Sequence, residues 1–124
     1  MELELKLIDL DLSIAKLSES INLDELTVKA KFLSYTKTEA EISLVIDSDN
    51  LPESQFASDG WKAIKINGPL DFSLVGILGQ IIRPLSEHGI SIFTISTFDT
   101  DYILVRQEQT ERALKVLSET FKIV

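Results

Sequence analysis

The sequence predicts an α+β fold made of two small units in tandem, each with an antiparallel sheet covered by helices on one face. Short segments in which apolar and polar residues alternate, as in half-buried strands, recur along the chain. Two segments of the second half instead repeat apolar residues every three or four positions, as amphipathic helices do. In residues 61–124 these segments follow the order β-α-β-β-α-β, which is the ferredoxin-like arrangement.

The second half begins with a strand at residues 61–67 and continues, after a loop, with a helix. Its apolar residues Ile77, Ile81 and Leu85 share one face of that helix. Gly89 suits the left-handed position that follows a last helical turn, because glycine has no Cβ to clash there. The sequence therefore predicts a helix that ends just before Gly89.

Two further strands and a second helix complete this half. Residues 90–97 and 101–106 are rich in β-branched and aromatic residues. The residues between them, 98–100, are few enough for a hairpin, so the two strands should pair antiparallel. An amphipathic helix follows at about 110–120, and residues 121–124 form a last strand.

The first half is less regular and poorer in helix. Its apolar alternation slips by one residue at Ile8, which predicts a bulge or a break in the first strand. Residues 28–35 and 40–47 have the pattern of two more strands, whereas 21–26 can make only a turn or two of helix. We therefore expect a helix-poor variant of the same β-rich unit.

A polar segment at residues 48–60 separates the two halves. Its proline, aspartates and glycine predict a loop, with room for a brief helix at 53–57. This boundary divides the chain into an N-terminal unit at 1–60 and a C-terminal unit at 61–124. Each is marginal alone, so the two should bury their apolar faces against each other or pair edge to edge.

Composition and charge exclude several classes of protein. Of the 124 residues, 44% are hydrophobic and 26% are charged, which is ordinary for a folded domain. There is no cysteine, so disulfides and thiolate metal sites are excluded. The net charge of -8 repels phosphate backbones, and no stretch approaches the roughly 20 apolar residues of a membrane span. We expect a cytoplasmic protein that binds neither nucleic acid nor membranes.

Few residues suit catalysis, metal binding or a cofactor. The carboxylates of Asp99 and Asp101 lack the glycine and glutamate that an EF-hand calcium loop needs further along. The glycines do not form a nucleotide-binding motif, and His88 is the only histidine. Trp61 suits a core or interface position better than a stacking role. The sequence thus predicts no enzyme, no metal and no cofactor.

The regions around residues 76–78 and 96–101 combine groups that could bind a free amino acid. The first N–H groups of a helix have no intrahelical partner and favour an anion such as a carboxylate. Hydroxyls and a carboxylate at the hairpin could meet an ammonium or guanidinium group. The alternative is that Asp99 and Asp101 are only solvated turn residues. The candidate ligand-binding residues are Val75, Gly76, Ile77, Leu78, Ser96, Thr97 and Asp101.

Three stretches of the second half resemble the ACT domain family: GIL at 76–78, PLSEHGIS at 84–91 and ISTFDTDYILVR at 95–106. The resemblance is to its tandem-ACT branch, which includes the cytosolic arginine sensor of animal cells and short bacterial proteins. It implies a regulatory fold that binds small ligands, commonly amino acids, at interfaces between ACT units. By position, it implies backbone contacts from Gly76 and Ile77 and polar contacts from Thr97 and Asp101.

The resulting hypothesis is a small regulatory protein that binds an amino acid without catalysis. Leu74 and Val75 stand where arginine-sensing relatives have an acidic residue, so the identity of the ligand stays open. Because ligands of this family lie between units, we expect a homodimer or a higher homo-oligomer, together with an unknown protein partner. The alternative is a structural or adaptor module that oligomerises through its sheets and binds no ligand.

Overall fold

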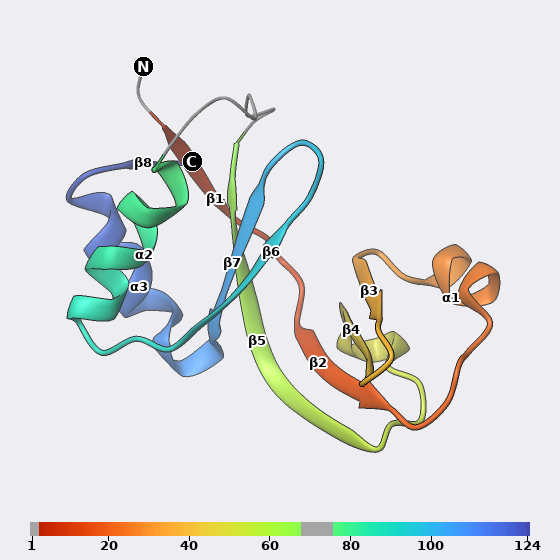
Figure 1. The fold of residues 1–124 in the computed structure, drawn as a ribbon. Coiled ribbons are helices and arrows are strands. Elements are labelled where there is room, and N and C mark those ends of the chain that lie inside the picture. Colours follow the sequence, from red (N-terminus) through yellow and green to blue (C-terminus); the bar gives the residue numbers. More distant parts are fainter. Residues whose placement is uncertain (1–2, 68–75) are drawn as a thin grey trace. The chain divides into compact units, whose positions relative to one another are not determined.

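The protein folds into two compact units, whose elements Figure 1 shows as a ribbon. The computed structural model of the chain describes residues 3–67 and 76–124. One unit, here called the continuous unit, consists of residues 10–61. The other, here called the split unit, consists of residues 1–9 and 62–124.

The continuous unit is a four-stranded antiparallel sheet with one short helix. Its elements are β2 (Leu12–Leu17), α1 (Leu23–Lys29), β3 (Leu33–Lys37), β4 (Ile42–Asp47), the 3-10 helix η1 (Ser48–Asn50) and the first residues of β5 (Phe56–Ile66). The strands lie in the order β3-β4-β2-β5, and each is antiparallel to its neighbour. Apolar side chains from α1 and the sheet, among them Leu26, Leu44 and Ile46, form the core of this unit.

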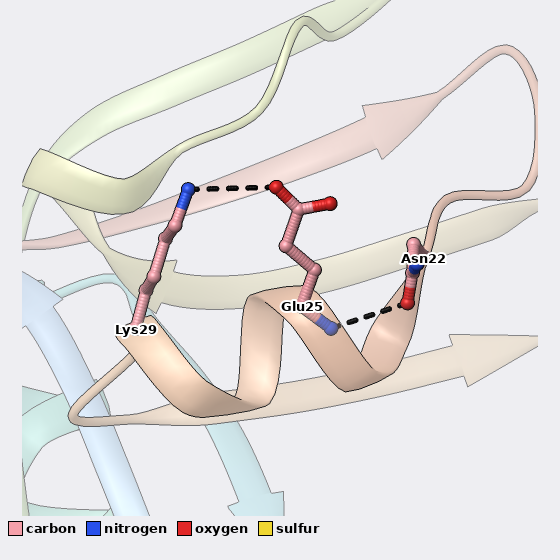
Figure 2. A network of polar contacts seen from close by, with 3 residues as sticks. All are labelled: Asn22, Glu25 and Lys29. Carbon is pink, nitrogen blue, oxygen red and sulfur yellow. Dashed lines mark hydrogen bonds and ion pairs between the residues drawn. The ribbon is translucent and has the colours of Figure 1, made fainter.

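α1 extends further than the sequence predicts, and it takes up part of an expected strand. The side-chain oxygen of Asn22 accepts a hydrogen bond from the N–H of Glu25 at 3.1 Å and so begins the helix (Figure 2). The helix runs on through Val28, which is 87% exposed, and β3 begins only at Leu33. The short helix is confirmed, but the strand predicted at 28–35 is wrong in its first half, because a capped helix outweighs the strand propensity of Val28.

A buried carboxylate holds the chain between α1 and β3. Asp47, at the end of β4, accepts hydrogen bonds at Oδ1 from the backbone N–H groups of Lys31 at 2.9 Å and Phe32 at 3.1 Å. Its Oδ2 accepts a hydrogen bond from the side-chain amide of Asn50 at 2.6 Å. Burial raises the pKa of Asp47, but the hydrogen bonds from Phe32, Asn50 and Lys31 outweigh burial, so this pKa lies below its ordinary value.

β5 starts earlier than the sequence predicts. The loop expected at residues 48–60 gives way to strand at Phe56, and no helix forms at 53–57. The prediction of a loop is therefore wrong for the last five residues of that segment. The glycine and aspartate that indicate a loop there belong instead to an irregular strand.

The irregularity is a bulge in β5 opposite β2. Leu12 pairs with Trp61 and Ile14 pairs with Ser58, so β5 carries one more residue than β2 between the two pairs. Gly60 lies within this bulge with a φ of +79°, a conformation that favours glycine. The indole N–H of Trp61 donates to the hydroxyl of Ser58 at 3.0 Å, and the Trp61 side chain is buried. The predicted core position of Trp61 is confirmed.

The split unit contains five strands and two α-helices among the described residues. Besides the rest of β5, its elements are β1 (Glu4–Leu7), α2 (Ile77–Glu87), β6 (Ile92–Ser96), β7 (Asp101–Arg106), the 3-10 helix η2 (Gln107–Gln109), α3 (Thr110–Ser118) and β8 (Lys122–Ile123). From β5 to β8 the order is β-α-β-β-α-β, as predicted. β6 and β7 pair antiparallel from Ile92 with Val105 to Ser96 with Asp101, which confirms the predicted hairpin.

β1 gives the split unit a sheet that differs from the predicted four-stranded one. It pairs antiparallel with β5, where Leu5 faces Ile66, and parallel with β8, where Leu5 faces Ile123. The sheet order is therefore β6-β7-β5-β1-β8, because β1 occupies the place beside β5 that β8 takes in a ferredoxin-like sheet. The break predicted at Ile8 is confirmed, since β1 ends before it and β2 begins later. The domain division at residues 60 and 61 stays a prediction.

Both helices of the split unit pack against the same face of its sheet. Figure 1 shows α2 and α3 side by side there. Ile81 and Leu85 of α2 share one core cluster with Leu117 of α3 and with Leu5 of β1, and all four are fully buried. The N–H of Gly89, whose φ is +69°, donates to Ser86, and that of Ile90 donates to Leu85. This is the glycine-capped helix end that the sequence predicts.

Candidate functional site

The hairpin between β6 and β7 carries most of the polar residues that the sequence singles out. Ser96 and Asp101 form the last cross-strand pair, and the hydroxyl of Ser96 donates to the carboxylate of Asp101. Thr97 closes the turn, because its N–H and its hydroxyl both donate to the carbonyl of Thr100, at 2.8 Å and 3.1 Å. The hairpin thus presents an oriented carboxylate at the start of β7.

A buried hydroxyl ties this turn to the end of β5. Thr100 is 5% exposed, and its Oγ1 donates to the backbone carbonyl of Ile66 at 2.5 Å. Ile66 faces Leu5 of β1, so the turn is joined to the middle of the sheet. Thr100 was not among the sequence-based candidates. Its only signal in the sequence is a β-branched hydroxyl residue at the end of an acidic turn.

The start of α2 carries the backbone N–H groups that the sequence predicts as an anion-binding site. Gly76 is the N-cap residue, with a φ of +80°, and no side chain among the described residues caps the helix. The first N–H groups of the helix have no intrahelical partner, so they can meet an anion. The side chains of Ile77 and Leu78 pack against the core of the split unit. Val75 lies outside the described residues.

The structure brings some of the candidate residues together and leaves others apart. Ser96 and Asp101 are in direct contact, and Gly76, Ile77 and Leu78 follow one another at one helix end. Within the described part of the chain, no hydrogen bond joins these two groups. The hydroxyl of Thr97 also accepts from the N–H of Thr100 at 3.3 Å, so it serves the turn itself.

Other kinds of site find little support in residues 3–67 and 76–124. There, no group of three or more histidine, cysteine, aspartate or glutamate side chains lies close enough to hold a metal ion. No helix in these ranges is both long and apolar enough to cross a membrane. His88 lies at the end of α2, where its Nδ1 contacts the carbonyl of Pro84 at 2.7 Å.

The order β-α-β-β-α-β from β5 to β8 defines a small α+β domain of the ferredoxin-like kind, with β1 added to its sheet. The chain belongs to one family of this kind, the ACT domain family, whose model matches residues 56–119. The match includes all of β6, β7 and the hairpin between them, together with α2. The resemblance of the second half to this family is therefore confirmed.

Several proteins are similar to the chain in sequence. The cytosolic arginine sensor for mTORC1 subunit 1 of Bos taurus is 30% identical over 106 residues, which cover 77% of this chain and 32% of that protein. The human protein of that name is 29% identical over the same length. The chain thus spans about a third of the length of these relatives. The human putative protein CASTOR3P is 30% identical, with 77% of this chain and 67% of that protein covered.

Solved structures support the fold. A crystal structure of a protein from Agrobacterium tumefaciens is 34% identical, with a TM-score of 0.86 over 100% of this chain and 93% of that one. The regulatory subunit of aspartate kinase from Thermus thermophilus is only 10% identical, yet its TM-score is 0.65 over 95% of this chain and 97% of that one. The second likeness shows a shared α+β fold and nothing further.

Proposed function

We propose that this chain is a non-catalytic regulatory ACT protein that binds a free amino acid at the hairpin of the split unit and the start of α2. The observation that supports this most is the carboxylate of Asp101, which Ser96 orients at the rim of the hairpin. The family of the chain and the printed function of its arginine-sensing relatives point the same way. The ligand-binding residues in this proposal remain Val75, Gly76, Ile77, Leu78, Ser96, Thr97 and Asp101.

The chemistry of the proposed site matches the two charges of an amino acid. Asp101 keeps acceptor capacity beyond its bond to Ser96, because a carboxylate can accept about four hydrogen bonds. It therefore attracts an ammonium or a guanidinium group. The N–H groups that follow Gly76 accommodate a carboxylate, which the positive end of the α2 dipole also favours. Thr100 supports the site indirectly, because it holds the turn against Ile66.

Regulation requires that the ligand favour one state of the protein over another. In this proposal a second ACT unit from another copy of the chain covers the hairpin, where Phe98 is 81% exposed. The ligand then stabilises the association of copies, and a protein partner in the cytoplasm distinguishes the two states. The free outer edge of β6, which pairs only with β7 among the described strands, offers a route for such association.

A thermal-shift screen of the purified chain against the twenty amino acids tests the proposal. A ligand present at 100 times its dissociation constant adds about 2.7 kcal/mol to the free energy of unfolding, which raises the melting temperature by several degrees. Asp101→Asn should abolish the shift, because it removes the charge that meets the ligand. Light scattering with and without the active amino acid then reports the number of copies.

The matched control is Asp99→Asn, which removes a carboxylate from the exposed turn of the same hairpin. This variant should keep the shift. If no amino acid raises the melting temperature while the chain still forms an oligomer, the adaptor reading replaces the sensor. A shift that survives in Asp101→Asn but disappears in Asp99→Asn would move the site to the turn.

A further inference from the structure

The continuous unit contains a pocket of about 380 Å³ between α1 and the segment after β4. This volume lies at the lower end of the range of about 300–1,000 Å³ that is typical of small-molecule sites. Its apolar lining comes from Ile21 and Leu26 on one side and from Leu51 and Pro52 on the other. Leu26 is also part of the core of this unit, so the base of the pocket is firmly supported.

The pocket exists because the continuous unit has little helix to cover its sheet. α1 has only 7 residues, and the segment after β4 forms the 3-residue helix η1 before it turns into irregular chain. In the split unit, by contrast, two longer helices pack side by side on one face. The space beside α1 therefore remains open, and its lining combines apolar with polar side chains.

Most polar groups around the pocket already have partners. The carboxylate of Glu25 lies 3.6 Å from the ammonium group of Lys29, one turn further along α1 (Figure 2). The side chain of Asn22 caps the helix, and that of Asn50 donates to Asp47. Asp49 is different, because no hydrogen bond or ion pair within the described residues reaches its carboxylate.

The balance of charge around the pocket is negative. Glu25 and Asp49 contribute two carboxylates, and Lys29 contributes one ammonium group, so one negative charge remains. The pair of Glu25 and Lys29 is largely exposed, and exposed pairs of this spacing contribute little energy. The lining of the pocket therefore combines a few apolar side chains with one uncompensated carboxylate.

We propose that this pocket binds a small organic cation, namely a primary amine with a short apolar chain. The ammonium group pairs with Asp49, and the apolar chain replaces water against Leu26, Leu51 and Pro52. A free carboxylate on the ligand is unfavourable, because the net charge of the lining residues is negative. The site involves none of the residues proposed above for amino-acid binding.

A nuclear magnetic resonance titration of the full chain tests this assignment with three compounds that share one branched chain. These are 3-methylbutylamine, which has only the ammonium group, 4-methylpentanoate, which has only the carboxylate, and leucine, which has both. The amide signals of α1 and of residues 49–51 should shift with millimolar amine, less with leucine and not with the acid. Signals at the hairpin should stay unchanged with the amine, which separates this result from any failure of the amino-acid proposal.

Two substitutions among the lining residues should change the affinity for the amine in opposite directions. Asp49→Asn should weaken the binding of the amine about fivefold, as expected for one exposed charge pair. Lys29→Gln should strengthen it, because it removes the only cation among the lining residues. The control Asp24→Asn removes an exposed carboxylate from α1 that does not line the pocket, and it should leave binding unchanged. Absent shifts with the amine, equal loss in both aspartate variants, or tighter binding of the acid would each overturn the proposal.

Discussion

At the scale of single residues, Asp47 shows how one side chain can order a whole connection. Its carboxylate accepts the N–H groups of two residues in the turn between α1 and β3 and the amide of Asn50. The side chain is 5% exposed, so these partners replace water almost completely. Hydrogen bonds that involve a charged group stabilise a fold more than neutral ones, by about 1.5–3 kcal/mol each.

We expect Asp47→Asn to destabilise the protein by about 1–3 kcal/mol at neutral pH. The variant loses the charge, and its own amide cannot accept the hydrogen bond from Asn50. The pKa of Asp47 is lowered in the folded state, so its stabilisation is present above the unfolded pKa of about 3.9 and is lost as pH falls through the folded pKa. Denaturant unfolding between pH 7 and strongly acidic pH measures this difference.

The difference in the free energy of unfolding between the unchanged chain and Asp47→Asn should therefore shrink as the pH falls below about 4. Asp49→Asn is the control, because its carboxylate is exposed and has no partner among the described residues. It should change the free energy of unfolding by no more than about 0.5 kcal/mol. A difference for Asp47→Asn that stayed constant down to strongly acidic pH would contradict the role assigned to its charge.

At the scale of elements, two glycines in regular structure allow backbone conformation to be separated from packing. Gly60 lies in the bulge of β5 with a positive φ, and Gly79 lies inside α2. A Cβ added at either position would meet nothing within 4 Å. The effect of an alanine at each site therefore comes from the backbone and not from a clash.

Gly60→Ala should destabilise the protein by about 1–2 kcal/mol, because an alanine is strained at positive φ. Gly79→Ala should stabilise it by about 0.4–1 kcal/mol, because alanine restricts the unfolded chain and suits a helix. Thermal or urea unfolding of both variants measures whether the free energy of unfolding falls or rises. If the two variants changed the free energy of unfolding equally, the bulge would not require a glycine in the left-handed conformation.

Elements with a strong local pattern could be predicted from the sequence. The strand at 101–106 was predicted with its observed bounds, and the second helix within about two residues. The first half of the strand at 28–35 and the last five residues of the loop at 48–60 were predicted wrongly for specific reasons. Asn22 starts a helix whose length depends on its cap. A glycine in a strand bulge cannot be told from a glycine in a loop by the sequence alone.

Some contacts of the candidate site could be predicted from the sequence and others could not. Ser96 and Asp101 could be predicted as neighbours, because a short turn brings the ends of two strands together. The contact of Thr100 with Ile66 could not, since its partner is a backbone carbonyl 34 residues away that carries no side-chain signal. The pocket beside α1 was also missed, because it depends on how far one short helix covers its sheet.

At the scale of the whole molecule, the position of β1 is what the sequence could not indicate. Its alternating leucines predict a strand but not its partners. In the structure β1 lies between β5 and β8, and Leu5 is fully buried. The C-terminal half therefore depends on residues at the start of the sequence for a continuous sheet.

We expect Leu5→Ala to destabilise the split unit by about 2–5 kcal/mol, the usual cost of removing a large buried aliphatic side chain. Hydrogen exchange should report the loss at α2, α3 and β8, whose side chains share the core cluster with Leu5 or pair with β1. Lys6→Ala, on the exposed face of the same strand, is the control and should stay within about 0.5 kcal/mol.

A fragment of residues 61–124 extends this test, because it contains the predicted C-terminal domain without β1. It should be much less stable than the full chain, and a peptide of residues 1–9 should restore its protection from exchange. A fragment that is stable alone would mean that β8 can pair directly with β5, as in a ferredoxin-like sheet.

The central place of β1 also sets an order of events during synthesis. β1 leaves the ribosome before both of its neighbouring strands, because β5 begins only at residue 56 and β8 follows α2 and α3. Residues 10–61, by contrast, pair among themselves and can fold while translation continues. β1 must therefore wait for β8, which is made about 115 residues later, and such distant pairings form slowly. Its two charged residues, Glu4 and Lys6, help to keep it soluble during that delay.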